Sequence, residues 1–246
     1  YEMDGDMVGA LREHAAVIAI DPESATRSSQ RCGVMVTFGA FAEARKCIEA
    51  ARGPNGEDFA EAARRGLAMQ SGDYEQALHL SEHPRYADPW AKVVPLLALG
   101  RAREALALLQ ALEPEMFVQP EPRLTTAFPY DGLYGGAALI GAGAQAQGRD
   151  LVQRTLAANA ARPILRLDTG RYWSDVYGWA LLGDTAKACA ATREAVAAGL
   201  VGGFAQFDAN PVYADLRKQA CFREALAPAR AKAAAQVAAA RAAGLL

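Results

Sequence analysis

GAFAEARKCIEAA, residues 39–51, is the stretch that decides the fold of this chain. After its opening glycine, Phe41, Ala44 and Ile48 follow at offsets of two, five and nine residues. Glycine accepts the positive φ of a tight turn between two antiparallel helices. A small residue five positions later lets those two helices approach each other closely. The stretch therefore predicts the second helix of a helical hairpin.

The same frame recurs along the chain. Thirty-four residues separate Gly5 from Gly39, and thirty-three separate Gly39 from Gly72, whose stretch GDYEQAL again has an alanine at offset five. The frame at residue 148 has Gln153 where alanine is expected. The helices expected before the last five turns lie near residues 24–38, 57–70, 86–99, 132–147 and 171–182. The predicted repeat turns are Gly5, Gly39, Gly72, Gly100, Gly148 and Gly183.

A single hairpin buries only one face, so neighbouring hairpins must stack to complete a core. We therefore expect an all-α fold, an α-solenoid of stacked antiparallel helical hairpins over residues 1–203. Prolines at positions 120, 122 and 129 forbid a continuous helix, so residues 113–131 are expected to form an irregular insertion. Residues 204–246 are expected to close the solenoid as a C-terminal capping segment, with a last helix that ends at Gly244.

From about Gly5 to Leu200 these frames resemble the tetratricopeptide repeat (TPR) family, although one spacing of 28 residues and one of 48 depart from its period. The resemblance implies a TPR-like superhelix that binds a protein or peptide partner. The tail, with DANPVYADLRKQACFREAL at residues 208–226, is similar to the ends of TPR modules in bacterial CadC-type winged-helix regulators and adenylate cyclases. That similarity implies that the chain is the regulatory part of a larger bacterial signalling or transcriptional regulator.

The bulk composition excludes several classes of partner. A formal charge of -2 with 22% charged residues provides no basic field for nucleic acid. The hydrophobic fraction of 52% contains much alanine, which favours packed helices, and no stretch is long and apolar enough to predict a membrane span. We expect a cytoplasmic location, or a periplasmic one if the chain is the C-terminal half of a membrane-anchored regulator.

The TPR resemblance also implies which residues line a binding groove, because the first helix of each TPR hairpin faces the concave surface. Trp90 and Trp173 lie ten residues before their turn glycines, and Tyr177 lies six before. Polar neighbours such as Gln70 would suit a peptide beside aromatic anchors. Ordinary packing between helices is the alternative for each residue, and Trp179 is expected in the core. The predicted groove residues are Phe59, Met69, Trp90, Gln145, Arg171, Trp173 and Tyr177.

The four cysteines include no Cys-x-x-Cys pair that would indicate zinc or redox chemistry. Buried free thiols are the preferred interpretation. A disulfide between Cys32 and Cys47 is the alternative in an oxidising compartment, because both lie on neighbouring helices of one predicted hairpin. His79 and His83 are spaced by four residues, but two ligands do not complete a metal site, so we expect a solvated helix face and no metal.

IGAGAQAQG at residues 140–148, followed by Asp168, imitates a dinucleotide-binding fingerprint. That fingerprint requires a preceding strand, whereas the surrounding sequence is alanine-rich and predicts helix. No nucleophile has a histidine base nearby, so we expect no catalytic residue and no cofactor. The sequence thus predicts a non-catalytic protein- or peptide-binding scaffold or docking module. The alternatives are a small-ligand sensor whose insertion closes a pocket in the groove and, more distantly, a dinucleotide-binding enzyme.

Overall fold

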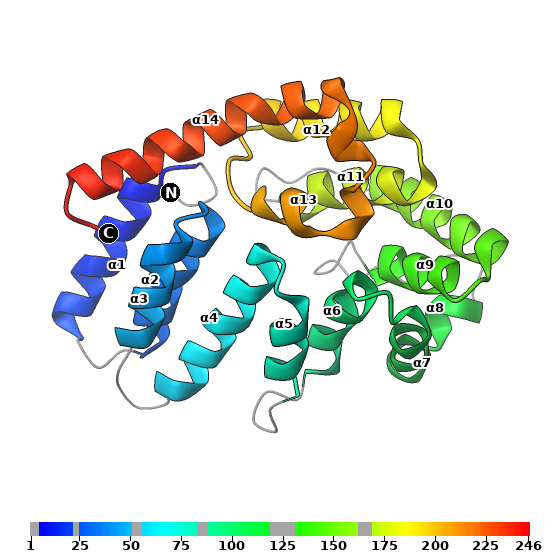
Figure 1. The fold of residues 1–246 in the computed structure, drawn as a ribbon, viewed down its shortest axis with the longest axis horizontal. Coiled ribbons are helices and arrows are strands. Elements are labelled where there is room, and N and C mark those ends of the chain that lie inside the picture. Colours follow the sequence, from blue (N-terminus) through cyan, green and yellow to red (C-terminus); the bar gives the residue numbers. More distant parts are fainter. Residues whose placement is uncertain (1–4, 22–24, 51–55, 83–87, 119–130, 162–168) are drawn as a thin grey trace. The chain divides into compact units, whose positions relative to one another are not determined.

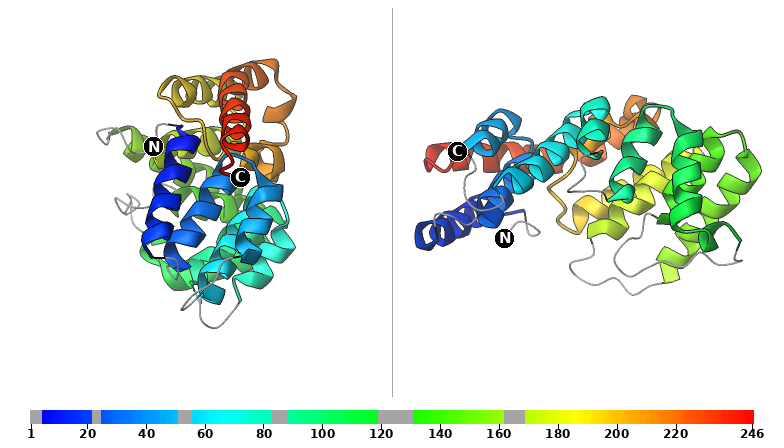
Figure 2. Two further views of the ribbon diagram at one scale, coloured as in Figure 1. Left: turned by 90° about the vertical axis from the view of Figure 1, so that its left-hand side faces the viewer. Right: turned by 90° about the horizontal axis from the view of Figure 1, so that it is seen from below.

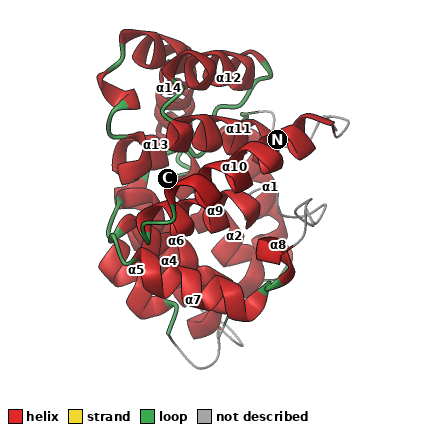
Figure 3. Ribbon diagram, turned by 90° about the vertical axis from the view of Figure 1, so that its right-hand side faces the viewer, coloured by secondary structure: helices red, strands yellow, loops and turns green. Residues whose placement is uncertain are grey.

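The computed structural model describes residues 5–21, 25–50, 56–82, 88–118, 131–161 and 169–246. Every regular element in these ranges is a helix, as Figures 1 and 3 show, and none of the described residues forms a strand. The all-α prediction is therefore confirmed for the described part of the chain. No helix in these ranges combines the length and the apolar character that crossing a membrane requires.

The chain forms two compact units. Unit 1 comprises residues 1–87, 199–209 and 226–246, and unit 2 comprises residues 88–198 and 210–225. Residues 204–246 thus contribute to both units, and the division expected at residue 203 stays a prediction.

Unit 1 consists of five consecutive helices and parts of the C-terminal segment. Successive helices pack against each other, and α2 also packs against α4, so the first helices of two neighbouring hairpins lie side by side. Its elements, of which Figure 2 gives two further views, are α1 (Met7–Ile20), α2 (Ala25–Thr37), α3 (Phe41–Ala50), α4 (Gly56–Ser71), α5 (Tyr74–Leu80), α13 (Ala205–Ala209) and the later part of α14 (Ala220–Ala242).

Unit 2 continues the same pattern of helices that pack against the next helix in the chain. Its most extensive helix–helix contacts join α9 to α10 and α11 to α12. The unit consists of η2 (Pro89–Lys92), α6 (Val93–Ala98), α7 (Ala102–Leu112), α8 (Glu115–Val118), α9 (Asp131–Gly141), α10 (Gln145–Ala161), α11 (Thr169–Leu182), α12 (Thr185–Ala197), η3 (Pro211–Tyr213), η4 (Leu216–Lys218) and the start of α14.

One hydrogen-bonded turn recurs between the paired helices. Gly39, Gly72, Gly100 and Gly183 have φ values of 81°, 83°, 73° and 71°. In each turn the residue after the glycine donates its backbone N–H to the carbonyl five residues earlier, as in Ala40 to Met35 at 2.9 Å. This bond satisfies a carbonyl that has no partner within the helix. It requires a residue in the left-handed backbone conformation, which glycine adopts readily. The same bond occurs in Asp73 to Ala68, Arg101 to Leu96 and Asp184 to Trp179.

The small residue at offset five is buried wherever the frame applies. Ala44, Ala77, Ala105 and Ala188 are each 0% exposed. Their methyl groups therefore lie in full contact with neighbouring helices, as the spacing predicts. Gly244 also has a positive φ, of 67°, directly after the last helical turn, so the predicted end of the final helix is confirmed.

The predicted turn at Gly148 is wrong. Gly148 lies inside α10, and the left-handed glycine of this hairpin is Gly143, with a φ of 100°. The helix expected over residues 132–147 accordingly ends at Gly141. Gly148 instead takes the buried small position five residues after Gly143, where a Cβ atom would lie 2.7 Å from the carbonyl oxygen of Gly136.

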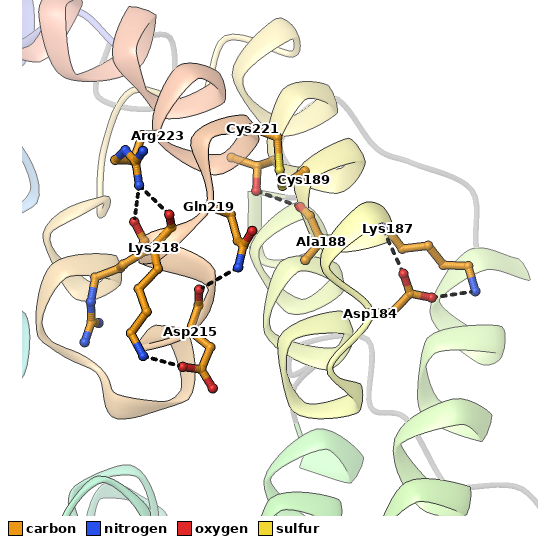
Figure 4. Close-up of a disulfide and its surroundings, with 11 residues drawn as sticks. Asp184, Lys187, Ala188, Cys189, Asp215, Lys218, Gln219, Cys221 and Arg223 are labelled. Carbon is orange, nitrogen blue, oxygen red and sulfur yellow. Dashed lines mark hydrogen bonds and ion pairs between the residues drawn. A yellow bond between two sulfur atoms is a disulfide. The ribbon is translucent and has the colours of Figure 1, made fainter.

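Two disulfides hold pairs of helices together, so the interpretation of all four cysteines as free thiols is wrong. Cys32 of α2 bonds to Cys47 of α3, the alternative pairing expected from the sequence, with Cα atoms 5.5 Å apart. Cys189 of α12 bonds to Cys221 at the start of α14, with Cα atoms 5.9 Å apart (Figure 4). None of the four cysteines remains free.

The C-terminal end of α14 packs on the first hairpins of unit 1. Ala233 and Ala240 enter the same core as Met7, Leu11 and Phe38. Arg241 pairs with Glu43 of α3 at 2.6 Å, and Arg31 of α2 donates to the carbonyl of Leu245 at 2.9 Å. These contacts place the last helix where a terminal hairpin would otherwise expose its apolar face.

Candidate functional site

The candidate site is an open groove of about 420 Å³ between α2 and α4 in unit 1. Both helices are the first members of their hairpins, the position from which a binding surface was expected. The groove is lined by Gln30, Gly33, Val36 and Thr37 of α2 and by Ala62, Ala63, Gly66, Met69 and Gln70 of α4.

The helical repeat explains why these residues share one face. Gln30, Gly33 and Thr37 follow an i, i+3, i+7 spacing, and residues 63, 66 and 70 follow the same spacing on α4. The two sets also occupy equivalent positions relative to the turn glycines. Gly33 and Gly66 each lie six residues before their turn, and Thr37 and Gln70 each lie two before. The groove is therefore formed by equivalent repeat positions of two successive hairpins.

The lining is uncharged and largely small. It contains no Lys, Arg, Asp, Glu or His among its nine residues. Its apolar members include Val36, which is buried, and Met69, which is half-buried. The Oε1 atom of Gln70 is buried and accepts no hydrogen bond from the described residues. The groove thus offers mainly apolar contact, and the unpartnered Oε1 atom of Gln70 is not accessible from it.

Within unit 1, residues 199–209 pack at the turn ends of the two groove helices. Gly203 donates its backbone N–H to the carbonyl of Thr37 at 2.9 Å. A Cβ atom on Gly72 would lie 2.9 Å from the Cβ atom of Ala209. The segment 199–209 therefore satisfies the backbone carbonyl of the last residue of α2, Thr37, by a hydrogen bond.

The predicted groove residues are divided between the two units. Met69 lines the groove described above. Phe59 lies in α4 and Arg171 in α11, but their side chains are outside the described residues. Gln145 is exposed at the start of α10, the second helix of its hairpin, and donates to the carbonyl of Ile140 at 3.4 Å.

The predicted aromatic anchors belong to the packing of unit 2. Trp173 is 7% exposed and Tyr177 is 5% exposed. The Tyr177 ring contacts the rings of Tyr134 and Tyr213 edge-on, with centroids 5.5 and 6.1 Å away. These observations favour the packing alternative for the two residues.

Trp90 has a similar environment in a different element. It lies in the short helix η2, where its half-buried side chain packs against the cluster of Met116, Leu139 and Leu151. Trp179, expected in the core, is half-buried, and the Nζ atom of Lys187 lies 4.3 Å from its ring centroid.

The sequence analysis did not identify seven of the groove residues: Gln30, Gly33, Val36, Thr37, Ala62, Ala63 and Gly66. A usable signal was present, because Gly33 and Gly66 lie 33 residues apart inside two predicted helices and at the same repeat position. The predicted groove residues were instead chosen mainly for their aromatic side chains. An open groove requires small side chains, so the two glycines at equivalent helix positions were the better indication of where a groove lies.

One ionisable group outside the groove has an unusual environment. Asp131 begins α9 in unit 2 and is 8% exposed. Burial, followed by the negative charge of Glu113, raises the pKa of its carboxyl from 3.8 to about 7. Burial and the charge of Asp131 also raise the pKa of Tyr134. No group of three metal-ligating side chains occurs in the described ranges, and His83 lies outside them.

Comparison of the chain with protein-family models, with curated proteins and with solved structures gave no match. The TPR resemblance therefore remains a prediction from the sequence.

Proposed function

We propose that this chain is a non-catalytic protein- or peptide-binding module, a TPR-like superhelix in which the groove between α2 and α4 receives the partner. The observation that carries the proposal is that equivalent positions of two neighbouring first helices line one open, uncharged groove. Recurring turns at left-handed glycines, each followed by a buried small residue, support the stacked-hairpin architecture.

The proposal extends to the parent protein and its compartment. The likeness of the tail to TPR modules of bacterial regulators favours a regulatory role within a larger signalling or transcriptional protein. Disulfides persist in oxidising compartments and are rare in the cytosol. The two disulfides therefore favour the periplasmic alternative over the cytoplasmic location first expected.

A small-ligand sensor is the second candidate. The groove volume of about 420 Å³ lies within the range of small-molecule sites, which run from roughly 300 to 1,000 Å³. Such sites usually include a few convergent polar groups, whereas the one unpartnered polar atom among this groove's lining residues, Oε1 of Gln70, is buried out of a ligand's reach. The dinucleotide alternative has less support, since residues 140–148 form a helix end, a turn and the start of α10 rather than a strand followed by a helix.

Two binding screens on the intact chain test the proposal. Selection from a phage-displayed library of short random peptides is expected to yield binders with micromolar dissociation constants, as measured by fluorescence polarisation. Thermal shift against a metabolite set is expected to leave the melting temperature unchanged, because a peptide groove gains nothing from small solutes by mass action. A metabolite that raises the melting temperature, together with a failed peptide selection, would establish the sensor instead.

A further inference from the structure

We draw no further inference here: the strongest candidate, the pocket of about 240 Å³ where α3, α4 and α5 meet in unit 1, has an apolar floor of Ile48, Leu67 and Ala68 under a rim of exposed side chains of both charges, and nothing in the structure shows what covers it.

Discussion

Replacing both Cys32 and Cys47 by alanine is expected to lower the free energy of unfolding of unit 1. The disulfide joins α2 to α3 across 15 residues of chain. A cross-link of that length stabilises the folded state by about 3 kcal/mol, mainly by restricting the unfolded chain. For a chain of this size the loss corresponds to a fall in melting temperature of roughly 6–12 °C.

The alanine variant also removes packing, because the Cys32 side chain is fully buried. Reduction of the wild-type chain breaks the same bond without removing atoms, so it isolates the covalent contribution. Calorimetry of both proteins with and without a phosphine reductant therefore gives four melting temperatures. The reductant is expected to lower the wild-type value by more than the variant value, and the difference measures the 32–47 bond alone. The Cys189–Cys221 bond is present in both proteins and cancels from the comparison.

Thiol titration under denaturing conditions completes the test. Chain isolated without reductant is expected to show no free thiol. Four free thiols and an unchanged melting temperature on reduction would refute the disulfides, and the argument for an oxidising compartment would fall with them.

Three further perturbations follow from the packing and from the titrating carboxyl. Ala77→Leu is expected to destabilise the chain by about 1–3 kcal/mol in denaturant unfolding, because the offset-five position is fully buried. Gly148→Ala is expected to lower the free energy of unfolding by about 1–3 kcal/mol, because its new methyl group has no room. Gly66→Ala is expected to raise it by up to about 1 kcal/mol, because the space beside Gly66 is empty and alanine favours the helix. Changes of the same sign in the two variants would contradict the packing argument. The raised pKa of Asp131 means that its carboxyl is protonated in the folded chain and ionised in the unfolded chain between pH 3.8 and about 7, so the free energy of unfolding falls as pH rises through that window. Asp131→Asn is expected to flatten this dependence in urea titrations across the window.

Much of the local structure could be predicted because glycine and alanine act through backbone geometry. Gly39 and Ala44 have the same roles in the structure as in the sequence pattern. The frame near residue 148 failed because glycine occupies both the turn position, Gly143, and the small buried position, Gly148. When both positions carry glycine, the sequence pattern alone does not show which of the two forms the turn.

The missed features depend on contacts between distant residues. Cys189 and Cys221 are 32 residues apart, and nothing in the repeat pattern brings α12 to the start of α14. The burial of Tyr177 likewise depends on Tyr213, which belongs to a segment outside the recognised frames. Secondary structure and turn geometry were therefore readable from local spacing, whereas side-chain environments were not.

The repeat position six residues before the turn differs between the groove in unit 1 and the hairpin of α11 and α12 in unit 2. In unit 1 that position is Gly33 and Gly66, and the space beside each is open. In the hairpin of α11 and α12 the same position is Tyr177, whose ring is buried against Tyr134 and Tyr213. A large aromatic side chain at this position fills the space with the chain's own atoms, while glycine leaves the space open. In the hairpin of α9 and α10 the same position is Ala137, which is buried although it is small. The side chain at this position is therefore one of several contacts that decide whether neighbouring helices form a packed core or leave an open groove.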